Sequence, residues 1–245
     1  MAREHVRDLV TVVIPAFNAA ETIDETLSSV RWQTYRCLEI IVVDDGSTDK
    51  TAEIVRQHIA RDQRVRLIKQ ENSGVAAARN RGISEALGDY VAPIDADDVW
   101  RPEKIEKQMA ALHGAGEAVG LVYTWSAVID ANSRILRRPA GARHAGHVAY
   151  EVACSNFIGN GSAVLMRKAA IQEAGGYDPS LRARSAEGAE DWLLYFRIAA
   201  RYQFALVPEH LTGYRFLPTN MSANVLRMLK GFDVVAGEMC KIYPQ

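Results

Sequence analysis

Residues 38–47, LEIIVVDDGS, and residues 90–98, YVAPIDADD, share the pattern that decides the fold. In each, an apolar run rich in β-branched residues ends abruptly in carboxylates. Residues 9–14, LVTVVI, form a third such run, which Pro15 follows. Continuous runs of this kind are typical of strands buried on both faces of a sheet. We therefore expect strands at 9–14, 38–43 and 90–94, with a shorter one at 65–69.

Helical patterns separate these runs. Ile23, Leu27 and Val30 recur at spacings of four and three, which places one apolar stripe against a sheet. Residues 74–87 are rich in alanine and predict a helix closed by Gly88 as its C-cap. Pro102 suits the first position of another helix. The alternation predicts an α/β fold with a single, mostly parallel, Rossmann-like sheet flanked by helices.

The pattern changes after about residue 115. We expect strands at 120–129 and 162–166, a loop over 134–147, and a helix over 191–201. Because no stretch rich in Pro, Gly or Ser divides the chain, we expect one domain with two halves, 1–115 and 116–245.

Composition excludes several classes of protein. The chain has 245 residues, 48% of them apolar, and a net charge of −1, which argues against a dedicated nucleic-acid binder. Its three widely spaced cysteines favour a reducing compartment over a disulfide or zinc framework. The first ten residues carry no secretory signal, and the longest apolar stretch is too short to span a bilayer. We expect a cytoplasmic protein, and peripheral contact with the inner face of the membrane stays open.

The carboxylates after the fourth strand are the first candidate site. Asp95, Asp97 and Asp98 lie within four residues and repel one another unless a cation neutralises them. Their oxygen ligands suit Mg²⁺ or Mn²⁺. A solvated acidic turn that caps the following helix is the alternative. The position at a strand end, where ligands bind in open α/β sheets, favours the metal site.

Other polar groups are expected near the same edge. Asp44 and Asp45 could accept hydrogen bonds from a base or a ribose, or serve only as turn residues. Phe17 could stack on a base or belong to the core. Arg79 could reach a phosphate or pair with an acid. The pair Glu190 and Asp191 opens a helix and could supply a general base or merely favour the helix dipole.

Taken together, these residues resemble family 2 glycosyltransferases with the GT-A fold. The resemblance runs from about Val10 to Phe216. It rests on residues 10–34 (VTVVIPAFNAAETIDETLSSVRWQT), 39–51 (EIIVVDDGSTDKT), 71–102 (ENSGVAAARNRGISEALGDYVAPIDADDVWRP), 175–178 (GGYD), 190–192 (EDW) and 214–215 (YR).

The resemblance implies a role for each residue. Asp45 would read the base edge, usually uracil, and Asp97 would ligate the metal through the diphosphate. Asp191 would be the catalytic base, positioned by Glu190, in one inverting displacement. The residues implied in donor binding are Pro15, Phe17, Asn18, Asp44, Asp45, Arg79, Asp95 and Ala96.

The same resemblance makes residues 1–115 the half that binds the nucleotide sugar. Residues 116–245 would bind a hydroxyl acceptor, a glycan or a lipid-linked one, and carry the base. The expected cofactor is Mn²⁺ or Mg²⁺, the expected donor is UDP-linked, and no nucleic-acid partner is expected.

Two departures from the family pattern matter. Leu217 stands where many relatives have a His after the Tyr-Arg pair, and Arg215 is a candidate to supply the lost contact. A Gln-x-x-Arg-Trp signature is absent, which favours single transfer over polymerisation. Two alternatives stay open. One is a non-catalytic domain that binds nucleotide sugars. The other, a sugar nucleotidyltransferase, lacks its glycine-rich phosphate loop near the first strand.

Overall fold

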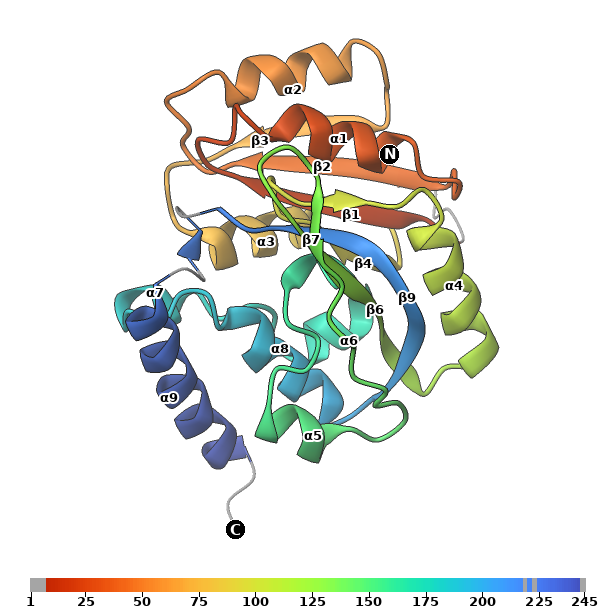
Figure 1. Cartoon of the computed structure of the whole chain (residues 1–245), viewed down its shortest axis with the longest axis vertical. Coiled ribbons are helices and arrows are strands. Elements are labelled where there is room, and N and C mark those ends of the chain that lie inside the picture. Colours follow the sequence, from red (N-terminus) through yellow and green to blue (C-terminus); the bar gives the residue numbers. More distant parts are fainter. Residues whose placement is uncertain (1–7, 218–219, 222–223, 243–245) are drawn as a thin grey trace.

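A computed structural model describes residues 8–217, 220–221 and 224–242 of the chain. Within these residues, one curled sheet of nine strands is flanked by helices (Figure 1). The strands are β1 (Val10–Ala16), β2 (Leu38–Asp44), β3 (Val65–Lys69), β4 (Tyr90–Pro93), β5 (Val99–Trp100), β6 (Val119–Ile129), β7 (Ile135–Arg137), β8 (Val164–Arg167) and β9 (Gln203–Arg215). The helices are α1 (Ile23–Arg31), α2 (Thr51–Ile59), α3 (Val75–Ser84), α4 (Lys104–Ala115), α5 (Ala149–Cys154), the 3₁₀ turn η1 (Gly161–Ala163), α6 (Lys168–Glu173), α7 (Ser180–Ala183), α8 (Glu190–Ala199) and α9 (Val225–Ile242).

The first four strands confirm the predicted parallel α/β unit. β1 pairs in parallel with β2 on one side and with β4 on the other, and β3 extends the sheet beyond β2. The carboxyl ends of these strands therefore meet at one edge. That edge carries the acids that follow β2 and β4.

The second half adds a mixed set of strands to the same sheet. The full order is β3-β2-β1-β4-β8-β6-β9-β5, with β7 on the outside of β6. β8 is antiparallel to both β4 and β6, whereas β9 runs parallel to β6. The sheet is thus entirely parallel in its first half and mixed in its second. Both predicted halves share one sheet, while their separate roles stay predictions.

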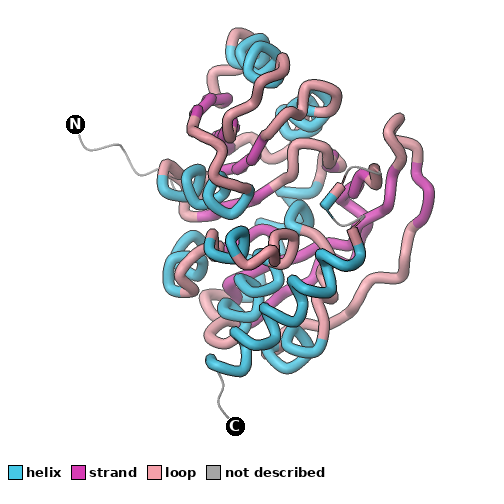
Figure 2. The backbone as a smooth tube through the Cα atoms, turned by 90° about the vertical axis from the view of Figure 1, so that its left-hand side faces the viewer, coloured by secondary structure: helices cyan, strands magenta, loops and turns pink. Residues whose placement is uncertain are grey.

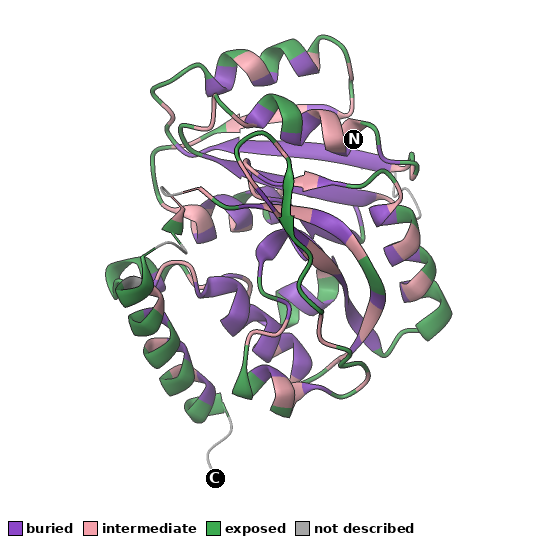
Figure 3. Cartoon of the chain, in the orientation of Figure 1, coloured by how far each residue is buried: buried purple, intermediate pink, exposed green. Residues whose placement is uncertain are grey.

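Helices cover the two faces of the sheet unequally. α1, α2 and α4 pack on one face through residues such as Leu27, Val55 and Met109. α3, α5, α6 and α8 pack on the other, and α9 joins them through Val235 and Met239. Figure 3 shows the buried strands between these layers and the exposed outer surface of α9.

Two helix ends differ from the sequence predictions. α3 ends at Ser84, so Gly88 is not its cap. A Cβ at Gly88 would lie 2.3 Å from the carbonyl oxygen of Leu9, so close approach of two backbones requires the glycine there. Pro102 lies in the turn before α4, whose first residue is Lys104.

Three strands were not predicted. β5 has two residues, and β9 is identified by its pairing with β6 and β5. The residues predicted as a loop over 134–147 include β7, which pairs with β6 off the main strand order and lies at the right of Figure 2. Across the described residues, no helix is both long and apolar enough to cross a bilayer.

Candidate active site

The loops after β1 and β2 are tied together at the edge of the sheet. Asn18 adopts a left-handed backbone conformation with φ 48°. Its N–H donates to the Ser47 hydroxyl (2.9 Å), and its side-chain oxygen accepts from the Thr48 N–H (2.9 Å). Phe17 is 53% exposed, which excludes the core position that the sequence left open. Its neighbour Pro15 is buried within β1.

The two acids that end β2 organise the surrounding backbone. Asp44 accepts from the Ser47 N–H (2.9 Å). Asp45, 3% exposed, accepts from the N–H groups of Ser73 and Gly74 (2.8 Å each) and from the Gln70 amide (2.7 Å). A carboxylate offers about four acceptor positions, so one is left for a ligand. The predicted contact between Asp45 and a base stays a prediction.

The three acids after β4 point to different partners. Asp98 is buried and accepts from the Ser162 hydroxyl (2.5 Å) and the Arg215 N–H (2.8 Å). Burial, together with the charges of Asp97 and Asp95, holds the pKa of Asp98 well above its usual range. Asp95 instead pairs with Arg79 (2.6 Å). The cluster is therefore divided between a buried structural acid and acids nearer the surface.

Asp97 is the carboxylate of this cluster that stays available. It makes no hydrogen bond or ion pair to the side chain of another described residue, although the Asp97 carbonyl accepts from Arg215. Burial and the neighbouring Asp95 raise the pKa of Asp97 to about 6. An acid whose charge is disfavoured in this way gains from a cation.

The acids at this edge fit a metal ion that takes some of its ligands from a bound substrate. No group of three His, Cys, Asp or Glu side chains suited to a metal occurs among the described residues. Mg²⁺ and similar ions are often held by only one or two carboxylates, with substrate phosphates and water completing the shell. Asp97 could serve as such a ligand, with Asp95 beside it.

Arg79 connects the β4 acids to α8. Its guanidinium is buried between Asp95 and Glu190 (3.3 Å) and lies 5.2 Å above the ring centroid of Tyr177. Burial opposes its charge, but the neighbouring carboxylates, Asp95 foremost, hold the pKa of Arg79 well above its usual value. The structure therefore brings Arg79 together with the predicted catalytic pair.

Glu190 and Asp191 lie at the N-terminus of α8, facing this cluster. Glu190 accepts from the Gly188 N–H (2.6 Å) as well as from Arg79. Burial raises the pKa of Asp191 to about 7; Arg79 opposes this shift, while Glu190 and Asp95 add to it. A carboxyl group with a pKa near neutrality is suited to general base catalysis.

The 3₁₀ turn η1 contributes residues that the sequence analysis missed. Ser162 donates to Asp98 and accepts from the Asp95 N–H (3.0 Å). A Cβ at Gly161 would lie 2.9 Å from an Arg79 nitrogen and 3.6 Å from an Asp191 oxygen. The run 159–162, GNGS, was the available signal, because two glycines beside polar residues indicate close backbone approach.

Arg215 does not supply the contact suggested for it. Nε donates to the Asp97 carbonyl (2.6 Å), and Nη1 donates to the carbonyls of Asp130 (2.9 Å) and Ala131 (3.0 Å). Nη2 donates to Glu25 (2.7 Å) and to a serine hydroxyl. Since all five N–H donors are engaged, the guanidinium has none left for a phosphate.

Ala96 anchors the acidic turn to the start of α1. Its side chain is buried, and its carbonyl accepts from the hydroxyls of Thr22 (2.9 Å) and Thr26 (3.0 Å) on the α1 side. The backbone of the acidic turn is thus anchored before any ligand binds.

Curated proteins of known name resemble this chain in sequence. The chain is 34% identical over 170 residues to the amylovoran biosynthesis glycosyltransferase AmsB of Erwinia amylovora, covering 66% of this chain and 56% of that one. It is 43% identical over 104 residues to the putative teichuronic acid biosynthesis glycosyltransferase TuaG of Bacillus subtilis, covering 42% and 41%. The chain thus spans about half the length of these curated relatives.

Two solved structures share the fold. TarS of S. aureus superposes with a TM-score of 0.72 at 19% identity, covering 95% of this chain and 40% of that one. The mannosyltransferase PcManGT of Pyrobaculum calidifontis, solved with GDP-Man and Mn²⁺, has a TM-score of 0.68 at 22% identity, covering 91% and 61%. These likenesses establish the GT-A fold. The model of glycosyl transferase family 2 matches residues 11–175, and the chain therefore belongs to that family.

Proposed function

We propose that this chain transfers a sugar from a UDP-linked donor to a hydroxyl group of a glycan or lipid-linked acceptor, with inversion, in polysaccharide or glycoconjugate biosynthesis. The observation that carries the proposal is the cluster around Arg79, where Asp95 of the β4 turn faces Glu190 and Asp191 of α8. Support for the donor comes from TarS, which has been solved with UDP-GlcNAc, and support for the pathway from the polysaccharide names of AmsB and TuaG.

The proposed reaction is one in-line displacement. Asp191 removes the proton from the acceptor hydroxyl as its oxygen attacks the anomeric carbon. The bond from that carbon to the β-phosphate oxygen breaks on the opposite side, and the nucleoside diphosphate leaves with the electron pair. Glu190 and Arg79 hold Asp191 within a buried, charged frame, which limits its reorganisation during the reaction.

The donor would lie along the carboxyl edge of the sheet. We propose that Phe17 contacts the base and that Asp44 and Asp45 order the loop beside it. Asp97 would hold Mn²⁺ or Mg²⁺, which would offset the charge that develops on the departing diphosphate. The solved complex of PcManGT with GDP-Man and Mn²⁺ supports metal use.

The proposal is tested with Asp191→Asn, which keeps the shape and removes the base. We expect transfer to fall by about 10²–10⁴-fold, whereas UDP-sugar with Mn²⁺ should raise the melting temperature of the variant as it does that of the wild type. Transfer is measured as release of UDP from a panel of UDP-sugars and glycan acceptors. Near-normal turnover in the variant would remove Asp191 as the base, and a wild type that binds donor without consuming it would favour a non-catalytic domain.

A further inference from the structure

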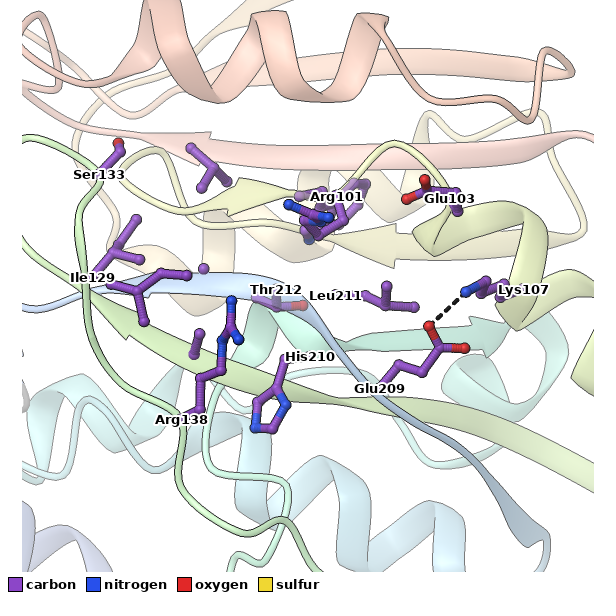
Figure 4. A pocket seen from close by; sticks show the side chains of 15 residues that line it. Arg101, Glu103, Lys107, Ile129, Ser133, Arg138, Glu209, His210, Leu211 and Thr212 are labelled. Carbon is purple, nitrogen blue, oxygen red and sulfur yellow. Dashed lines mark hydrogen bonds and ion pairs between the residues drawn. The ribbon is translucent and has the colours of Figure 1, made fainter.

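A cavity of about 620 Å³ has a lining that includes none of the acids described above (Figure 4). Its floor comes from β5, β6 and β9. Trp100 and Thr212 point inward, because the Trp100 indole N–H and the Thr212 hydroxyl both donate to the Ser162 carbonyl. Side chains alternate along a strand, so the neighbours Val99 and Gly213 face the cavity.

The absence of a side chain at Gly213 helps to form this hollow. A Cβ there would lie 2.8 Å from Val99 and 3.2 Å from Ile129. Together with Leu211, these residues make the floor apolar. Ile135 of β7 and Arg138, which follows β7, line one side of the cavity.

Two arginines of the lining have guanidinium groups with no carboxylate partner among the described residues. Arg101 follows β5 and Arg138 follows β7, and both are exposed. Neither guanidinium makes a hydrogen bond or ion pair to any residue that the structure describes. Figure 4 shows the Arg138 guanidinium directed across β9 toward the side where Arg101 lies.

The remaining charged groups of the cavity are mostly engaged. Lys107 pairs with Glu209 at 2.5 Å, and His210 contacts the carbonyl of Pro139 at 3.0 Å. Glu103 is the other acid in the lining. Residues 134–147 carry four arginines and no acid in a chain whose net charge is −1. The cavity therefore lies in a locally basic region.

We propose that this cavity binds an anionic oligosaccharide, with Arg101 and Arg138 holding its carboxylate or phosphate groups and the apolar floor contacting the C–H faces of its rings. Arginine forks match both anions geometrically. The volume falls in the range of small-ligand sites, roughly 300–1,000 Å³. Because the two arginines line a hollow, the site suits a ligand that inserts into it better than it suits the flat surface of a membrane. The site would retain a charged acceptor or product chain without using Asp191 or the residues around Arg79.

The test measures binding to the full chain by calorimetry at low salt. The probes are an oligogalacturonate for carboxylates, a glycerol-phosphate oligomer for phosphates, and a malto-oligosaccharide as the neutral reference. We expect at least one anionic probe to bind and the neutral one to bind at least about tenfold more weakly, because hydrogen bonds to charged groups are the strong ones.

The double variant R101Q/R138Q should weaken anionic binding by about tenfold or more. The control R36Q/R61Q makes the same charge change at two exposed arginines outside the cavity lining and should stay within about twofold. Unchanged binding in R101Q/R138Q, equal binding of the neutral probe, or binding only to vesicles of anionic lipid would each overturn the proposal. Since donor-induced melting shifts are measured on the same variants, failure here is distinguishable from failure of the proposed transferase activity.

Discussion

At the scale of single residues, Arg79 determines how the acids of the site coexist. Burying a guanidinium costs several kcal/mol unless carboxylates and hydrogen bonds compensate. Asp95 and Glu190 provide that compensation, one from each side of the site. Asp191 stays close enough for Arg79 to lower its pKa, but burial has the larger effect. A base poised near neutral pH results from these opposing contributions.

The raised pKa of Asp191 predicts an acid limb in the pH profile. A pKa of about 7 means that Asp191 is mostly protonated at pH 6 and mostly ionised at pH 8. Only the ionised form can accept a proton, so kcat/KM should rise tenfold per pH unit below about pH 7 and level off above it. The profile is measured at saturating Mn²⁺ with a fixed donor. A limb near pH 4 would show that the base has an ordinary pKa.

Gly161→Ala tests the close packing against Arg79. The added methyl would lie 2.9 Å from an Arg79 nitrogen, so the guanidinium must shift away from its partners. We expect a loss of about 1–3 kcal/mol of stability, together with reduced transfer. The matched control is Gly114→Ala in α4, where a Cβ meets nothing within 4 Å; there we expect a gain of about 0.5–1 kcal/mol. The change in stability is measured from the melting temperatures of both variants. Equal melting temperatures for the two would contradict this prediction.

At the scale of elements, the end of β9 joins the acidic turn to α1 and the β6–β7 connection. Arg215 bonds the Asp97 carbonyl, the carbonyls of Asp130 and Ala131, and the carboxylate of Glu25. Its own N–H binds Asp98. One buried side chain thus fixes three segments that are distant in the sequence.

Removing this side chain should destabilise the whole protein. For Arg215→Met we expect a loss of about 3 kcal/mol or more, because buried carbonyls lose their donors. The melting temperature should then fall by roughly 6–12 °C. Glu25→Gln is the control: its side chain is 50% exposed, so losing that ion pair should cost at most about 1 kcal/mol. The idea fails if both variants melt like the wild type.

At the scale of the whole molecule, one sheet runs through both halves of the chain. β4 pairs with β8, and β5 pairs with β9, so strands from 1–115 need strands from 116–245. The core on the α1 and α4 side also includes Leu165 and Val207 from the second half. The two halves are therefore parts of one folding unit.

A fragment that ends at residue 115 should fail to fold cooperatively. It would leave the edge of β4 unpaired and part of its core exposed. The comparison is a chain that ends at residue 224, which lacks α9 and so loses Val235 and Met239 from the buried core. Thermal unfolding is monitored by circular dichroism. We expect a cooperative transition from the chain that ends at residue 224 and none from the fragment that ends at residue 115. A stable 1–115 fragment would show that the halves are independent.

The local sequence determined the first four strands, the helices between them and the positions of the acids. Buried parallel strands are continuous apolar runs, and carboxylates directly after such runs must lie at the carboxyl edge of the sheet. Asp95 and Asp97 were thus recognisable as candidates. The roles of Glu190 and Asp191 came instead from the resemblance to family 2, and that family membership is confirmed. The two-residue β5 and the irregular β9 could not be recognised from the sequence, because pairing with distant strands defines them.

Only the tertiary structure decided what each polar group contacts. It turned Asp98 inward, used Asp45 to hold the 70–74 backbone, and enclosed Arg79 between two acids. These outcomes depend on contacts between residues that are 16 to 117 positions apart in the sequence. Sequence patterns report burial and periodicity along the chain, whereas the partner of a buried charge depends on which strands and helices meet in space.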